Sequence, residues 1–241
     1  MKAKTKVAVI LAGGLGTRLQ SVVSKVPKPM APVGGKPFLD IILRYWIDQG
    51  ITKFIISVGY KYESIINYFG DIFEGVSIEY VIEKEPLGTG GGLLKVLSDS
   101  NSNINEQFLI VNGDTFFSVD LHELEKFHFK NNSKWTIALF KSTDKDRYMQ
   151  FHLSLSSEII DIMNCNSTDS SFSNAGIYLI DNKNIIIKNS PNKKKFSLEA
   201  DIISKIIGKN MMFGFYTDQT FLDIGIPKDY ESSKSVLSKY L

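Results

Sequence analysis

A glycine-rich segment near the N-terminus has the composition of a phosphate-binding loop. Residues 13–19 read GGLGTRL and directly follow the apolar run of residues 7–11. Without a Cβ, glycine lets backbone N–H groups approach phosphate oxygens closely. Arg18 belongs to this segment, and Lys28 follows between two prolines that stiffen its backbone. Either cation alone also suits an exposed turn, but together they can neutralise a polyphosphate, so we predict a phosphate site.

The spacing of the glycines excludes two familiar nucleotide motifs. The dinucleotide fingerprint requires a third glycine where Leu19 stands and an acidic residue at the end of the next strand. The Walker motif requires Gly-Lys-Ser or Gly-Lys-Thr, which does not follow the loop. The loop therefore indicates a nucleotide site of another kind.

The segments that must position this loop alternate between strand-like and helix-like patterns. We expect strands at residues 7–11, 54–58, 78–82 and 108–111, and helices at 38–49, 64–69, 91–97 and 121–130. This alternation is typical of a parallel sheet covered by helices on both faces, which binds ligands at the carboxyl ends of its strands.

Strands crowd together in the second half of the chain, which indicates an antiparallel extension of the sheet. The expected strands are residues 135–140, 148–155, 158–163 and 176–180. A helix at 198–207, a strand at 211–216 and a closing helix at 228–240 follow, with loops at 98–105 and 164–174.

Composition excludes several classes of function. The 241 residues carry 28 basic and 26 acidic side chains, and this balance argues against nucleic acid as an obligatory partner. No apolar run reaches the roughly 18 residues of a membrane span. The one cysteine, Cys165, excludes an internal disulfide and favours a cytoplasmic location. We expect a single domain over residues 1–241, with no membrane partner.

The glycine loop is the first of a series of motifs that resembles one known family. After GGLGTRL come PKP at residues 27–29, EPLGTGGGL at 85–93, VNGDTFF at 111–117, NAGIYLI at 174–180 and FLDIGIPKDY at 221–230. In this order, over nearly the whole chain, they resemble the motifs of the sugar-1-phosphate nucleotidyltransferases. Among the members, the D-glycero-D-manno-heptose 1-phosphate guanylyltransferases are the most similar. The resemblance implies the three-layer α/β/α Rossmann-like fold of nucleotide-diphospho-sugar transferases, with a mixed, mostly parallel sheet and an antiparallel extension.

The reaction that this resemblance implies joins a nucleoside triphosphate to a sugar 1-phosphate. A phosphate oxygen of the sugar attacks the α-phosphorus and pyrophosphate leaves, so cations, backbone donors and Mg²⁺ must hold two anions together. The implied substrates are GTP and D-glycero-D-manno-heptose 1-phosphate. Mannose 1-phosphate with GTP, or glucose 1-phosphate with UTP, dTTP or CTP, is the alternative within the same chemistry. A non-catalytic nucleotide-sugar-binding protein is the alternative of another class.

The resemblance also assigns roles to individual residues. It implies Arg18, Lys28 and Asp114 as catalytic residues, and Asp114 and Asp223 as ligands of Mg²⁺, although an aspartate after a strand is also a common turn residue. The implied nucleotide-binding residues are Leu11, Ala12, Gly13, Gly14, Gly16, Thr17, Arg18, Lys28, Glu83, Pro86, Leu87, Gly88, Thr89, Asn112 and Gly113. The implied sugar-phosphate residues are Tyr148, Asn174, Ala175, Gly176 and Glu199.

The sugar side departs from the family's pattern. Met149 replaces the glycine that follows Tyr148, and Ile226 stands where threonine is common. Residues 164–165, Asn-Cys, replace the Glu-Lys pair that holds the sugar phosphate. We therefore expect a substitute cation from Lys193, Lys194 or Lys195 or from a partner subunit in a homo-oligomer, or else a reduced activity.

Overall fold

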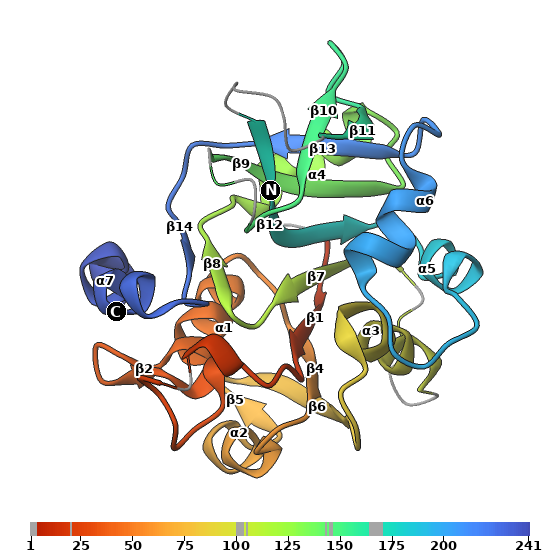
Figure 1. The fold of residues 1–241 in the computed structure, drawn as a ribbon. Helices are drawn as coiled ribbons and strands as arrows, with labels where there is room; N and C mark the ends of the chain where they lie inside the picture. The colour runs from red at the N-terminus through yellow and green to blue at the C-terminus, as the bar shows by residue number, and fades with distance from the viewer. Residues whose placement is uncertain are drawn as a thin grey trace.

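Four parallel strands form the centre of the computed structural model, which describes residues 4–19, 21–99, 104, 106–142, 144, 147–163 and 171–241. In spatial order they are β7 (Phe108–Asn112), β1 (Val7–Ala12), β4 (Lys53–Val58) and β6 (Val76–Ile82) (Figure 1). The register pairs Ile10 of β1 with Ile56 on one side and Val111 on the other. Because the four strands run parallel, the residues that follow them meet along one edge of the sheet.

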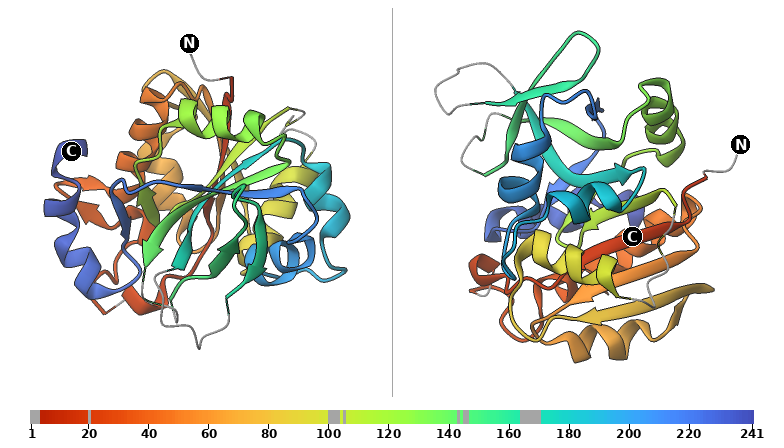
Figure 2. Two further views of the ribbon diagram at one scale, coloured as in Figure 1. Left: turned by 90° about the horizontal axis from the view of Figure 1, so that it is seen from above. Right: turned by 90° about the vertical axis from the view of Figure 1, so that its right-hand side faces the viewer.

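Side chains of the central strands alternate between two hydrophobic cores. Ala8 and Ile10 of β1 belong to one core and Val9 to the other. The first core is covered by α1 (Phe38–Asp48), α2 (Tyr62–Phe69) and α4 (Leu121–Lys130). The second is covered by α3 (Gly88–Ser98), α5 (Asn184–Asn189) and α6 (Ser204–Ile206). Figure 2 shows helices on opposite faces of the sheet, and the expected three-layer fold is confirmed.

The second half of the chain extends this sheet with antiparallel pairings, as the sequence predicts. β12 (Ser171–Ile180) pairs with β7 along one edge and with β9 (Trp135–Ser142) along the other. The hairpin of β10 (Gln150–Leu153) and β11 (Ile159–Ile162) and the parallel strand β13 (Met212–Tyr216) complete this part. Among the described residues, no helix has the length and apolar character needed to cross a membrane.

Short strand pairs outside the main sheet carry the loops of the site. β8 (Thr115–Phe117) pairs with β14 (Phe221–Asp223), and the register places Asp223 opposite Thr115. α7 (Pro227–Val236) begins after a connection of three residues that follows β14. A second pair outside the main sheet joins β2 (Pro32–Val33) to β3 (Lys36–Pro37), whereas β5 (Ile72–Phe73) pairs with β6 at the edge of the main sheet. The β8–β14 pair brings Asp114 and Asp223 together from distant parts of the sequence.

Three sequence-based boundaries need correction. The loop expected at residues 164–174 ends earlier, because residues 171–174 already belong to strand β12. Their composition is polar, but they pair with β9 and β10, and this pairing decides their conformation. The helix expected at 198–207 is a π-helical turn, Glu199–Ile203, followed by α6. In the loop expected at 98–105, Ser98 still belongs to α3, and residues 100–103 and 105 lie outside the described residues.

Candidate active site

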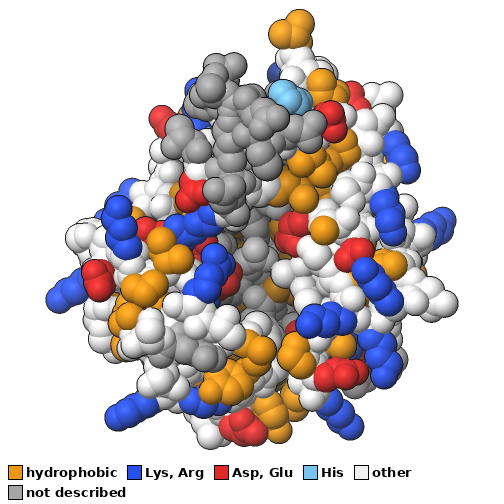
Figure 3. Space-filling model, viewed as in Figure 1, with side chains coloured by type: hydrophobic (Ala, Val, Ile, Leu, Met, Phe, Trp, Pro, Cys, Tyr) orange, Lys and Arg blue, Asp and Glu red, His pale blue; other side chains and the backbone are white. Residues whose placement is uncertain are grey.

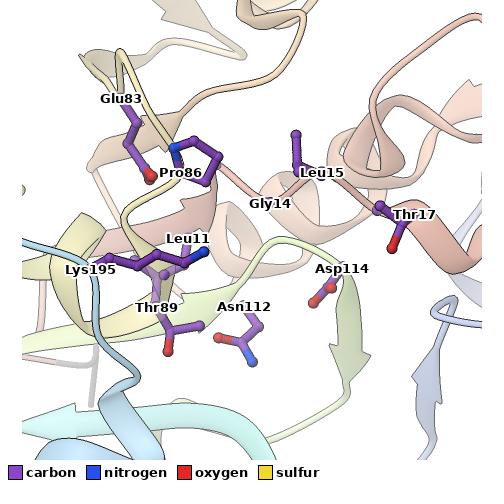
Figure 4. A pocket seen from close by; sticks show the side chains of 13 residues that line it. Leu11, Gly14, Leu15, Thr17, Glu83, Pro86, Thr89, Asn112, Asp114 and Lys195 are labelled. Atoms are coloured by element: carbon purple, nitrogen blue, oxygen red, sulfur yellow. The ribbon is translucent and has the colours of Figure 1, made fainter.

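Two adjoining cavities lie at the carboxyl edge of the parallel strands. The first, of about 400 Å³, is called the loop cavity here and is lined by residues 13–17 together with Leu11, Glu83, Pro86, Gly88, Thr89, Asn112, Asp114 and Lys195 (Figure 4). The second, of about 200 Å³, is called the carboxylate cavity and is lined by Arg18, Lys28, Asn112, Asp114, Thr115, Arg147, Tyr148, Met149, Asn174, Ala175, Gly176, Glu199, Phe221 and Asp223. Asn112 and Asp114 line both cavities, so the cavities meet at these two residues. Figure 3 shows this face hollowed at its centre, with acidic and basic side chains around the hollow.

The glycine loop packs directly against the lysine that follows it in sequence. Gly16 has a φ of +60°, and a Cβ added there would lie 2.8 Å from the Cβ of Lys28. The backbone at Lys28 enters a short turn, Lys28–Met30, after Pro27, and its side chain is only 8% exposed. A glycine is therefore needed at position 16 both for its conformation and to leave room for Lys28.

One end of the loop cavity offers a carboxylate and an ammonium group. Glu83 lies just beyond β6, and its carboxylate accepts hydrogen bonds from the Ser57 hydroxyl at 2.8 Å and the backbone N–H of Leu87 at 3.1 Å. Lys195 extends from the opposite side toward Leu11 and Thr89 (Figure 4). Two hydrogen bonds leave further lone pairs on the carboxylate, so Glu83 can accept from a ligand while Lys195 donates to it.

Charges of opposite sign alternate across the carboxylate cavity. The Nζ of Lys28 lies 2.7 Å from Oδ2 of Asp114 and 3.3 Å from Oδ1 of Asp223. On the far side of Asp223, the Nη2 of Arg147 lies 3.0 Å from Oδ2, and Arg147 also pairs with Asp229. Burial acts to lower the pKa of Arg147, but its bonds to Asp229 and Asp223 outweigh burial and raise it.

A hydrogen-bond chain connects the other walls of the two cavities. The Asn174 amide donates to the Tyr178 hydroxyl at 2.9 Å, and Tyr178 donates to Glu199 Oε1 at 3.0 Å. Thr89 of the loop cavity donates to Glu199 Oε2 at 2.8 Å. Burial and the neighbouring Glu199 carboxylate hold the pKa of Tyr178 well above its ordinary value, so its hydroxyl remains a donor. Gly176, with a φ of +75°, bulges β12 so that this wall approaches Asn112.

Most of the residues expected at the site line one of these cavities. Arg18 and Lys28 lie at the carboxylate cavity and not at the loop cavity. Three others line neither cavity and instead contact neighbouring parts of the protein. Ala12 packs into the first core, the Leu87 N–H supports Glu83, and the Gly113 N–H bonds the Leu11 carbonyl at 2.9 Å.

None of Lys193, Lys194 and Lys195, which were expected to supply a substitute for the missing lysine, lines the carboxylate cavity. Lys193 pairs with Asp201 and Lys194 with Glu85, whereas Lys195 lines the loop cavity. The Asn-Cys pair at 164–165 lies outside the described residues. Among the described residues, Lys28, Arg18 and Arg147 are the cations of the carboxylate cavity.

Sequence reasoning missed Arg147 and the position of Lys195. Arg147 directly precedes the predicted Tyr148, but nothing in its local sequence shows that it reaches Asp223, 76 residues away. Lys195 reaches the loop cavity because the Phe196 carbonyl accepts from the Gly90 N–H at the start of α3, which fixes this loop against the helix.

No group of three or more acidic, histidine or cysteine side chains gathers at one point within the described part of the chain. Asp114 and Asp223 nevertheless converge on one cation, the Lys28 ammonium. Two carboxylates facing one cation form a donor set that suits Mg²⁺, which otherwise takes phosphate oxygens and water.

Comparison with known proteins places this geometry in context. The sequence model of the protein family described as nucleotidyl transferase matches residues 7–239 of this chain. The chain is 42% identical over 234 residues to the D-glycero-alpha-D-manno-heptose 1-phosphate guanylyltransferase of Aneurinibacillus thermoaerophilus, covering 97% of this chain and 99% of that protein. It is 40% identical to the protein of the same name from Campylobacter jejuni, covering 92% and 96%.

The fold also matches solved structures. The crystal structure of HddC from Yersinia pseudotuberculosis superposes with a TM-score of 0.80 at 33% identity, covering 96% of this chain and 99% of that one. A complex of the same protein with GMP-PN gives the same TM-score.

Proposed function

The chain belongs to the nucleotidyl transferase family, and from this membership we propose that it joins GTP to D-glycero-α-D-manno-heptose 1-phosphate, forming the GDP-sugar and pyrophosphate. The observation that carries this proposal is the meeting of the two cavities at Asp114. A nucleotide in the loop cavity and a sugar phosphate in the carboxylate cavity bring the attacking oxygen and the α-phosphorus together at this residue. Such positioning of two anions is the main requirement of the reaction.

Guanine fits the end of the loop cavity that is lined by Glu83 and Lys195. The base carries N–H donors at N1 and N2 and acceptors at O6 and N7. The free lone pairs of the Glu83 carboxylate match the donors, and the Lys195 ammonium matches the acceptors. Adenine would place an amino donor and a ring acceptor against groups of the wrong kind. The similarity to heptose 1-phosphate guanylyltransferases of two organisms supports the same choice and the choice of sugar.

Cations of the carboxylate cavity suit the charge that develops during transfer. Arg18 and Lys28 stand where the nucleotide's phosphates meet the acceptor, and Lys28 is nearly buried, so its charge is weakly screened. We propose that Asp114 and Asp223 hold Mg²⁺, which when bound supplies positive charge to both phosphates. With Mg²⁺ offsetting the two carboxylates, the Lys28 ammonium that now pairs with them would be available to the nucleotide's phosphates.

The acceptor's sugar ring faces the hydrogen-bonding wall of the second cavity. Asn174 and Glu199 can bind sugar hydroxyls, and the backbone bulge at Gly176 opens the space for them. Both substrates are the partners that we propose for this protein, and the cytoplasm is the proposed location, where nucleoside triphosphates are available.

The test is a pyrophosphate-release assay on a matrix of substrates. GTP, ATP, UTP, dTTP and CTP are each combined with D-glycero-α-D-manno-heptose 1-phosphate, mannose 1-phosphate and glucose 1-phosphate in Mg²⁺. We expect the GTP and heptose pair to give the highest kcat/KM. Faster turnover of another pair would reassign the substrates, and no release from any pair would favour a binding protein.

A further inference from the structure

Five charged side chains form one chain of alternating sign that runs from the carboxylate cavity to helix α7. Their order is Asp114, Lys28, Asp223, Arg147 and Asp229. The first three belong to the site already described. Arg147 and Asp229 are not needed to bind either substrate as described above, yet the Arg147 side chain is only 12% exposed. A buried guanidinium of this kind has a cost in desolvation that its partners must offset.

Most of the N–H groups of Arg147 are directed at Asp223. Nε donates to Oδ2 at 3.2 Å, and Nη2 lies 3.0 Å from the same oxygen and donates to the Asp223 carbonyl at 2.9 Å. Nη1 turns the other way and bonds Asp229 in the first turn of α7. The guanidinium also lies over the ring of Tyr148, 5.1 Å from its centroid. Arg147 therefore binds both the side-chain carboxylate and the backbone carbonyl of Asp223.

The bonds from Arg147 determine which carboxylate oxygen of Asp223 faces the carboxylate cavity. With Oδ2 engaged by Arg147, Oδ1 is left toward Lys28, and the Gly225 N–H at 2.6 Å holds it there. Without Arg147 the carboxylate would keep only the bonds to Oδ1 and could rotate about its Cβ–Cγ bond. It would also lie opposite Asp114 with one cation fewer to offset the repulsion between two carboxylates.

We propose that Arg147 is a positioning residue that holds the Asp223 carboxylate in the orientation needed to bind a divalent cation. This inference rests on the proposed function, because it requires Asp223 to be a metal ligand. Partners of metal ligands orient them, and their loss weakens metal binding by about 10- to 100-fold. Asp229 is the outer anchor of Arg147 and contributes less, since Arg147 keeps its bonds to Asp223 without it.

A purely structural role predicts something different. If Arg147 only fastened α7 to the loop before β10, then Asp229→Asn would be as harmful as Arg147→Gln, because each removes the same ion pair. Both variants would lower the melting temperature, and neither would change the response to metal. A metal titration in the absence of turnover therefore separates the two roles.

The test measures binding of a fluorescent GTP derivative, without sugar phosphate, as Mg²⁺ is raised. For Arg147→Gln we expect the Mg²⁺ concentration at half-maximal enhancement to rise at least about tenfold. Arg147→Lys, which keeps one charged donor, should recover part of the loss, and Asp229→Asn should stay near the wild-type value. Arg44→Gln is the matched control, because Arg44 also bridges two carboxylates, Asp40 and Glu74, but outside the site.

Each outcome of this titration bears on a different claim. If Asp223→Asn abolishes the Mg²⁺ response while Arg147→Gln and Arg147→Lys both keep the wild-type midpoint, the role of Arg147 is wrong and the metal site stands. If Asp223→Asn also keeps the wild-type response, the metal assignment is wrong, and the inference falls with it. Circular dichroism of every variant confirms that the comparison is made between folded proteins.

Discussion

Asp114 and Asp223 lie 109 residues apart in the sequence and face the same ammonium group, that of Lys28, at 2.7 and 3.3 Å. The antiparallel pairing of β8 with β14 creates this relationship, since Thr115 stands opposite Asp223 in the register. Two carboxylates this close repel one another unless a cation lies between them. The structure thus holds a cation position in the carboxylate cavity, beside Asp114, where the two cavities meet.

Removing either carboxylate should therefore remove the metal-dependent reaction. We expect Asp114→Asn and Asp223→Asn to lower kcat by at least about two orders of magnitude, because in our proposal each removes a ligand of the Mg²⁺ that offsets the developing charge. A chelator should stop the wild-type enzyme, and added Mg²⁺ should restore it. Asp181→Asn is the control, since Asp181 pairs with Lys134 on the surface. If both site variants keep most of their Mg²⁺-dependent turnover, the metal lies elsewhere.

Loss of the buried lysine should be as severe. Lys28→Ala removes the cation that separates the two carboxylates and, in our proposal, later faces the nucleotide's phosphates. We expect kcat/KM to fall by at least about two orders of magnitude. Lys134→Ala, which removes an exposed ion pair, is the control. Near wild-type kinetics in Lys28→Ala would exclude the phosphate role.

Replacing the Glu83 carboxylate by an amide should alter the enzyme's preference for the base of the nucleotide. Glu83→Gln keeps the shape of the side chain but replaces an acceptor by an N–H₂ donor, which opposes the N–H groups of guanine. We expect kcat/KM for GTP to fall by about 10- to 100-fold relative to that for UTP, whose base offers one donor beside an acceptor. Glu85→Gln, two residues away at an exposed pair with Lys194, should leave the ratio unchanged. An unchanged ratio in Glu83→Gln would show that Glu83 does not contact the base.

Stability should depend on pH through a histidine outside the site. His128 is buried, with Nδ1 2.8 Å from the Thr136 hydroxyl, and burial lowers its pKa from 6.5 to about 4. Between these values the unfolded chain binds more protons than the folded one, so the free energy of unfolding falls as pH drops from 6.5 toward 4. The loss attributable to His128 is at most about 3 kcal/mol.

Denaturant unfolding of variants measures this contribution. His128→Gln should flatten the dependence of the unfolding free energy on pH within that window, whereas His122→Gln, at an exposed position of α4, should follow the wild-type slope. Equal slopes in wild type and His128→Gln would show that His128 is not held neutral in the folded state.

Local sequence could predict most residues that line the loop cavity, whereas the contacts within the carboxylate cavity depend on long-range pairing. The glycine loop and Asp114 follow strands whose apolar runs are visible in the sequence, so their meeting at one sheet edge follows from the parallel order. The partnership of Asp223 with Arg147 depends on β14, a strand of three residues, and on Arg147, whose neighbouring sequence shows neither helical nor strand periodicity. The polar start of β12 was likewise invisible, because its strand conformation depends on β9 and β10.

The most direct measurement is the identity of the product formed from GTP and D-glycero-α-D-manno-heptose 1-phosphate in Mg²⁺, followed by phosphorus NMR and mass spectrometry. We expect a GDP-sugar and pyrophosphate to appear in equal amounts with wild-type protein and neither to appear with Asp114→Asn. Release of inorganic phosphate without a GDP-sugar, or equal product from Asp114→Asn, would contradict nucleotidyl transfer at this site.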